Sequence, residues 1–206
     1  MLGPVVHDPE ALLTFWFGTL SEGLADDEHR NRWFQPDQGF DDQCRSQWAP
    51  LLAEAQTGKL SDWLTHPRGT LAYVVLCDQM PRNVHRGTAA AFAWDGLALD
   101  AARGAVASRA DLELGWDERC FLYMPFEHSE DPVDQHTAVG LFSALRDQSP
   151  SEIRHITGNY LRHAHQHRDI VLRFGRFPHR NAALGRTSSA REEEFISAGN
   201  GFGQSA

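Results

Sequence analysis

The side chains best suited to chemistry gather in three strings that lie far apart along the chain. The first and last strings are rich in arginine, whereas the middle string combines carboxylates with an imidazole. The candidate ligand-binding residues are Asp78, Arg82, Asn83 and Arg86 in the first string, Glu127, His128 and Asp131 in the middle string, and Arg173, Arg176, His179, Arg180, Asn181 and Arg186 in the last. A guanidinium is planar, permanently charged and matched to carboxylate or phosphate. We therefore expect the strings to converge in one polar cleft that holds a small anionic ligand or an acidic peptide.

The arginines have two interpretations, which are compatible with each other. They face a ligand, or they are partnered internally in a network that pins the helices together. The available carboxylates are Asp78, Glu127, Glu130 and Asp131. A binding module is the first functional hypothesis, because arginines that converge in a cleft suit an anionic ligand.

The middle string also supports an alternative, a hydrolase. His128 with Glu127 or Glu130 has the residue types of a general base, and the arginines would stabilise the negative charge that develops during the reaction. These three residues are the catalytic candidates. The sequence contains no phosphate-binding loop, dinucleotide fingerprint or nucleophile elbow, so the enzyme hypothesis comes second.

Metal binding is the third kind of chemistry that the residue types suggest. His163 and His167 have the four-residue spacing that lets two imidazoles of one helix meet a metal ion. His167 also shares a helix face with Ile170 and Phe174, which favours a core histidine hydrogen-bonded to a carboxylate or carbonyl. The carboxylates of the middle string are more typical of an acidic helix end paired with arginines than of a cation site. We expect neither a metal nor another cofactor.

The overall charge and hydropathy limit the partners. The chain has 206 residues and a formal net charge of −9, which disfavours nucleic acid as a partner. The longest clean apolar run, residues 71–77, is far shorter than the roughly 20 residues of a membrane span. The first residues also lack the basic and apolar regions of a secretory leader. We expect a cytoplasmic protein with no membrane or nucleic-acid partner.

Helical periodicity runs through nearly the whole chain. Asp8 and Asp131 each precede a proline, as in a helix N-cap, and Ser189 with Glu192 forms a capping box. Pro125 should kink or end its helix. We expect helices over about 9–18, 40–58, 69–79, 88–107, 117–126, 132–145, 151–174 and 192–196, within one domain over residues 1–198 that is followed by a flexible glycine-rich tail over 199–206.

The three strings closely resemble stretches of a bacterial family, domain-of-unknown-function family 924. The resemblance is carried by residues 78–88, 123–135 and 167–186, with further matches at 15–18, 33–34, 40–41 and Trp63. It implies an all-α fold similar to tetratricopeptide-repeat hairpins, with antiparallel helix pairs packed as a compact superhelix. It implies no activity, because the family has no established biochemistry. Pro132 departs from the apolar residue expected at its position, which predicts that the helix carrying His128 ends before it.

Overall fold

The computed structural model describes residues 8–35 and 37–199, which form helices and contain no β-strand. The expected all-α class is therefore confirmed. The α-helices are α1 (Pro9–Phe17), α2 (Asp27–Phe34), α3 (Gln38–Gln43), α4 (Ala49–Gln56), α5 (Pro67–Val74), α6 (Met80–Val84), α7 (Asp95–Ser108), α8 (Trp116–His128), α9 (Pro132–Gln148), α10 (Arg154–Phe174) and α11 (Ala190–Ser197). Two π-helical turns, η1 (Cys44–Trp48) and η3 (Val75–Gln79), and four 3-10 turns, η2 (Ser61–Thr65), η4 (Ala89–Phe92), η5 (Ala110–Glu113) and η6 (Pro178–Arg180), join them. Most of the predicted tail, 200–206, lies outside the described residues.

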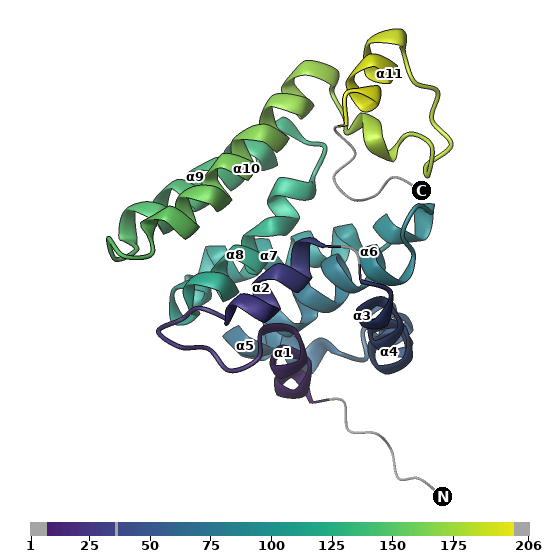
Figure 1. Cartoon of the computed structure of the whole chain (residues 1–206). Helices are drawn as coiled ribbons and strands as arrows, with labels where there is room; N and C mark the ends of the chain where they lie inside the picture. The colour runs from purple at the N-terminus through teal and green to yellow at the C-terminus, as the bar shows by residue number, and fades with distance from the viewer. Residues whose placement is uncertain (1–7, 36, 200–206) are drawn as a thin grey trace, which may run out of the picture.

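The helices divide into a body and a projecting hairpin (Figure 1). Helices α1 to α8 form the body, in which α5 packs against α1, α7 and α8. Helices α9 and α10 lie side by side and extend away from the body, and α11 follows beside η6. The end of α8, the end of α10 and the segment η3–α6 are thereby brought together where the hairpin joins the body.

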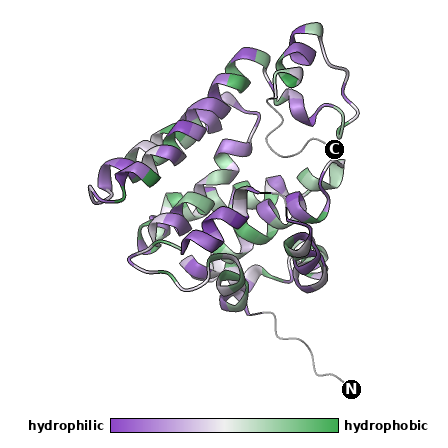
Figure 2. Ribbon diagram, in the orientation of Figure 1, coloured by the Kyte–Doolittle hydropathy of each residue, from purple (hydrophilic) through white to green (hydrophobic). Residues whose placement is uncertain are grey.

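The hydrophobic core lies in the body. Every residue from 69 to 78 is buried, as expected for a helical stretch that is apolar on nearly every side. Trp16, Phe17, Trp33 and Phe121 form an aromatic cluster with ring centroids 4.6 to 5.6 Å apart. Burying one such ring contributes roughly 1.5–3 kcal/mol. Figure 2 shows that the hairpin helices are largely polar, so the body supplies most of the apolar packing.

The predicted helix starts are confirmed where a capping side chain marks them. Asp8 and Asp131 accept hydrogen bonds from first-turn amides of α1 and α9 at 2.9 and 2.7 Å. Ser189 and Glu192 form the predicted capping box of α11. These side chains satisfy backbone donors that have no partner inside the helix. Helix α8 also ends at His128, before Pro132, as the departure at Pro132 predicts.

Four expected helices differ from the structure. The one expected over 69–79 is part of a longer stretch from 67 to 84, in which α5, the π-helical turn η3 and α6 follow one another. Residues 40–58 form α3 and α4 with the π-helical turn η1 between them. Thr88 starts only the short η4, and α7 begins anew at Asp95. Helix α8 continues through Pro125 instead of ending there. A proline removes a single backbone hydrogen bond, and the burial of the residues on both sides of Pro125 keeps this helix intact.

Gly69→Ala tests how closely α5 packs on η2. A Cβ at Gly69 would lie 2.2 Å from the backbone oxygen of Trp63, so the backbone must move to admit it. We expect the variant to lose about 1–3 kcal/mol of unfolding free energy in urea denaturation, the range for overpacked sites. Gly140→Ala in α9 is the control, because a Cβ there meets nothing within 4 Å and should stabilise the helix by about 0.5–1 kcal/mol. Equal unfolding free energies for the two variants would contradict this packing.

Candidate functional site

The buried carboxylate of Asp78 is the centre of the candidate site. Asp78 lies in η3 and is 0% exposed. Its Oδ1 lies 2.8 Å from Nδ1 of His128, at the end of α8, and 3.2 Å from a terminal nitrogen of Arg82, one turn later in α6. One carboxylate thus joins an imidazole and a guanidinium, and the imidazole comes from a residue 50 positions away in the sequence.

Arg82 extends the cluster to the start of α7. Its two terminal nitrogens lie 3.0 Å from the carboxylate oxygens of Asp95, and Arg180 of η6 lies 3.5 Å from the same carboxylate. The guanidinium of Arg180 also lies over the rings of Phe92 and Phe177, at 4.7 and 4.5 Å from their centroids. The junction network consists of Asp78, Arg82, Asp95, His128 and Arg180.

A buried ion pair between Glu127 and His167 lies beside the junction network. Nδ1 of His167 is 2.8 Å from the Glu127 carboxylate, which confirms the expected core histidine bonded to a carboxylate. The rings of His167 and His128 are 6.1 Å apart. Burial by itself lowers the pKa of His167, but Glu127 outweighs that effect and the pKa is raised. The pair therefore holds α10 against the end of α8.

Charge compensation is uneven across the junction network. Burial alone would raise the pKa of Asp78, but Arg82 and His128 lower it to about 2. Burial lowers the pKa of His128, and Asp78 offsets only part of this change. Burial and the neighbouring Arg82 lower the pKa of Arg180 to about 10. Asp95, Glu130 and Asp78 therefore offset only part of the effect that burial and Arg82 have on the Arg180 guanidinium.

His179 borders the same region. Burial, and then the positive charge of Arg180, lower the pKa of His179 to about 3, with His167, His128 and Arg82 acting in the same direction. Its imidazole is thus neutral at physiological pH. His128 and His179 are both half-buried, so the network reaches solvent along these two rings.

Glu130 and Glu192 bind the other arginines of the last string. The Glu130 carboxylate accepts hydrogen bonds from Arg186 at 2.7 and 3.0 Å and from the backbone N–H of Phe177 at 2.8 Å. Arg176 donates to both carboxylate oxygens of Glu192, at 2.7 and 2.9 Å. Such two-point pairs fix geometry as well as charge. These arginines therefore belong to an internal network that holds the segment after α10.

The remaining predicted residues have partners outside the junction network. Asn83 and Arg86 contact Asp41 of α3, at 2.7 and 3.3 Å. The others are held locally: Asp131 caps α9, Asn181 accepts a hydrogen bond from Arg186, and Arg173 lies over the ring of Phe174. The structure thus brings Asp78, Arg82, His128 and Arg180 together, with Glu127 and His179 beside them, and divides the rest of the expected single cleft among separate clusters.

Asp95 and Asp41 are the acidic partners that sequence reasoning missed. Asp95 lies inside the stretch 88–107 that the sequence predicts as one continuous helix, and this prediction gives it no role. The Trp94-Asp95-Gly96 sequence was the available signal, because an acidic residue is favoured in the first turn of a helix. Asp41 was noted only as a match to the family resemblance, and its partners lie 42 and 45 positions later.

Three hollows in the described part of the chain lie outside the junction network. One of about 510 Å³ is lined by Arg173, Arg176 and Arg191 beside the start of α11, and two others flank η2 and α5.

Within the described ranges, no group of three or more histidine, cysteine or acidic side chains is arranged to hold a metal ion. Every helix in those ranges is too short or too polar to span a bilayer.

The comparisons with known proteins cover nearly the whole fold and name no activity. A family model described as a bacterial protein of unknown function, DUF924, matches residues 12–200. A solved structure of a protein of unknown function from Agrobacterium tumefaciens is 34% identical, with a TM-score of 0.78, over 92% of this chain and 97% of that one. No curated protein matches the sequence.

Protonation of His179 should make the protein less stable in mild acid. Its folded pKa of about 3 is below the ordinary value of 6.5, so between these values the unfolded chain binds the extra proton and stability falls as the pH drops. Replacing His179 by Asn should remove about 2 kcal/mol of this loss at pH 5, as measured by urea denaturation at pH 5 and pH 8. Parallel stability profiles for wild type and variant would rule out this origin of the acid sensitivity.

Proposed function

This chain belongs to the bacterial DUF924 family, and on that premise we propose that it is a binding module for a small anion, held at the Arg180 end of the junction network. One observation supports the proposal above the others. Arg180 is only 7% exposed, and its Nε has no hydrogen-bond acceptor among the described residues. Leaving a buried donor unsatisfied costs about 1–3 kcal/mol. An oxygen of a bound carboxylate or phosphate would supply the missing acceptor.

The charges around Arg180 favour an anion over a neutral ligand. Arg82 and Arg180 share the carboxylate of Asp95. Both guanidiniums are shielded from water, so the positive charge of each one disfavours the charged form of the other. Burial first, and then this repulsion from Arg82, lower the pKa of Arg180. A bound anion would relieve that repulsion, because it adds negative charge to that of Asp95, Glu130 and Asp78, which offset it only in part.

The aromatic rings support the proposal because they hold the guanidinium in place. Arg180 lies over Phe92 and Phe177, and such cation–π contacts fix its plane before any ligand arrives. Less ordering then remains to be done on binding. The carboxylate of an acidic peptide and a free phosphate or dicarboxylate share the required chemistry.

Anion titration tests this proposal by thermal shift and calorimetry, with inorganic phosphate, citrate and a short acidic peptide as probes. A bound anion at 100 times its Kd should stabilise the fold by about 2.7 kcal/mol. Arg180→Lys keeps the charge but loses the planar fork of donors, so the shift should largely disappear. Arg146→Lys is the matched control, because the Arg146 side chain is 41% exposed near the end of α9 and pairs with Asp147.

An unchanged anion shift in a folded Arg180→Lys variant would overturn the site. A second readout covers the case in which that variant does not fold. Phosphate should move the ring-proton signals of His128 and His179 in the wild-type protein, because both imidazoles border the network. Signals that stay in place at saturating phosphate would also overturn it.

The contact between Asp78 and His128 supports a second candidate function, hydrolysis. The carboxylate 2.8 Å from Nδ1 requires that nitrogen to carry the proton, which leaves the lone pair of Nε2 free to act as a base. Nε2 makes no hydrogen bond to a described residue. It would take a proton from water while the water oxygen attacks an ester, amide or phosphoryl group, and would then return the proton to the leaving group.

The carboxylate that assists His128 in this candidate differs from the one expected. Glu127 is paired with His167, and Glu130 is paired with Arg186, so both are engaged elsewhere. Asp78 takes the orienting role instead.

A panel of ester, amide and phosphoester substrates tests the hydrolase with wild type and His128→Asn. Any activity should fall by roughly 100-fold or more in the variant, while His136→Asn, at an exposed position on α9, leaves it unchanged. Since the pKa of His128 is lowered, activity should persist below pH 6.5 and fail only in stronger acid. A panel that stays silent for wild type, or activity retained in His128→Asn, would remove this candidate.

A further inference from the structure

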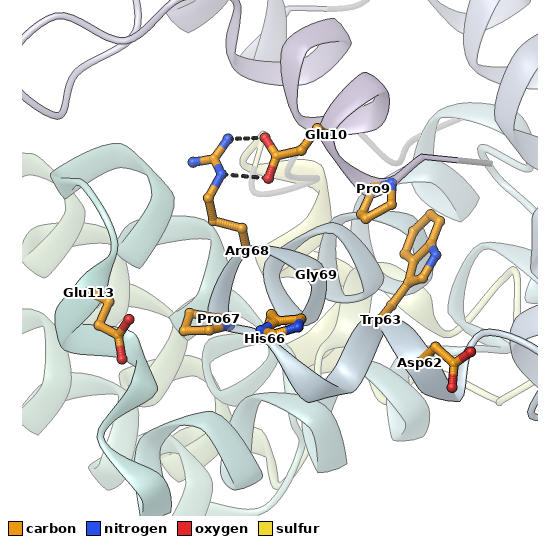
Figure 3. Close-up of a pocket in the computed structure, with 9 residues that line it drawn as sticks. All are labelled: Pro9, Glu10, Asp62, Trp63, His66, Pro67, Arg68, Gly69 and Glu113. Carbon is orange, nitrogen blue, oxygen red and sulfur yellow. Dashed lines mark hydrogen bonds and ion pairs between the residues drawn. The ribbon is translucent and has the colours of Figure 1, made fainter. Parts of the chain in front are cut away.

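A hollow on the body is built from residues that the junction network does not use. It has a volume of about 430 Å³ and lies between the start of α1, η2 and the start of α5 (Figure 3). Pro9, Trp63 and Pro67 give it an apolar wall. Hollows of this size accommodate small organic molecules.

Close backbone packing fixes this wall. Gly69 approaches the backbone of Trp63 so closely that no side chain fits between them. Trp63 is 8% exposed, and Figure 3 shows the ring of Pro9 next to its indole. The shape of the hollow is therefore set by the contact between α5 and η2 rather than by mobile surface side chains.

The hollow carries an excess of negative charge. Arg68 binds two carboxylates at once, Glu10 at 2.7 and 2.6 Å and Glu118 at 2.5 Å. Glu10, and then Glu118, raise the pKa of Arg68. Asp62 and Glu113 also line the hollow, are exposed, and make no ion pair with a described residue. Three carboxylates and one guanidinium thus line the hollow, and the guanidinium is already bound to Glu10 and to Glu118 behind it.

We propose that this hollow binds an organic cation, an ammonium or guanidinium group carried on a short apolar chain. The chain would lie against Trp63 and the two prolines, and the cation would lie near one of the two carboxylates that make no ion pair with a described residue, Asp62 or Glu113, which Figure 3 shows on opposite sides of His66. The charge excess and the apolar wall therefore select the same ligand class.

Calorimetric titration with phenethylammonium at low salt, where exposed charges are least screened, tests the site against 2-phenylethanol, its neutral counterpart. The ammonium should bind about tenfold more tightly than the alcohol. The double variant Asp62→Asn with Glu113→Gln should weaken ammonium binding by about tenfold. Both side chains are exposed and have no ion-pair partner among the described residues, so the variant should fold normally. Glu193→Gln with Glu194→Gln removes the same charge from exposed positions of α11 and is the matched control.

A free amine and the lysine side chain of a peptide are two sources of such a cation. A lysine peptide, with the neutral acetyl-lysine peptide as its counterpart, distinguishes them. Tighter binding of the lysine peptide than of the free amine would assign the site to a peptide side chain, and the reverse would assign it to a small molecule. Either result supports the proposal. Equal affinity for alcohol and ammonium, unchanged affinity in the double variant, or no binding by any probe up to about 10 mM would overturn it.

Discussion

The contact of Asp78 with His128 and Arg82 determines how the hairpin is attached to the body. A carboxylate that is 0% exposed remains charged only because an imidazole and a guanidinium both contact it. Removing one partner from such a buried cluster typically destabilises a protein by about 3–5 kcal/mol, because the remaining charge is left uncompensated. The end of α8, and with it the direction in which α9 and α10 leave the body, depends on this contact.

The arginines around this contact fall into two groups with different partners. Arg176 and Arg186 each engage a carboxylate through two nitrogens, and these pairs account for both charges. Arg180 is different, since it shares Asp95 with Arg82 and is otherwise covered by aromatic rings. The internal-network interpretation therefore explains most of the last string and leaves one guanidinium, that of Arg180, with a buried Nε that has no acceptor among the described residues, at the point where a ligand is proposed.

The fold class and several helix ends could be predicted from the sequence because the signals that determine them are local. Asp8, Asp131 and Ser189 act on amides two or three positions away, so the capping pattern is visible without any tertiary structure. The break before Asp95 was not visible, because the alanine-rich stretch after Thr88 fits a helix throughout. A break of this kind depends on packing against other helices.

The candidate site could be predicted only in part. Residue types and the family resemblance identified Asp78, Arg82, His128 and Arg180, but they did not identify which carboxylate each arginine contacts. Ion pairs such as Arg186 with Glu130, 56 positions apart, are set by the tertiary fold. The carboxylate of Asp131 shows a further limit, since the cap that the sequence predicted for α9 already occupies that side chain.

The π-helical turn η3 makes the site sensitive to the length of the chain before it as well as to its side chains. Segments α5, η3 and α6 form one continuous helical stretch from 67 to 84, and each residue of a regular α-helix turns the chain by about 100°. A π turn contains one residue more than a regular turn, so shortening 75–79 by a single position would let the stretch become uniformly α-helical. With Asp78 kept and one of the apolar residues 75–77 removed, Arg82 would then rotate away from Asp95 although every charged side chain of the site remained. The spacing between Asp78 and the residues before it is therefore as much a requirement of this site as the identity of its charged groups.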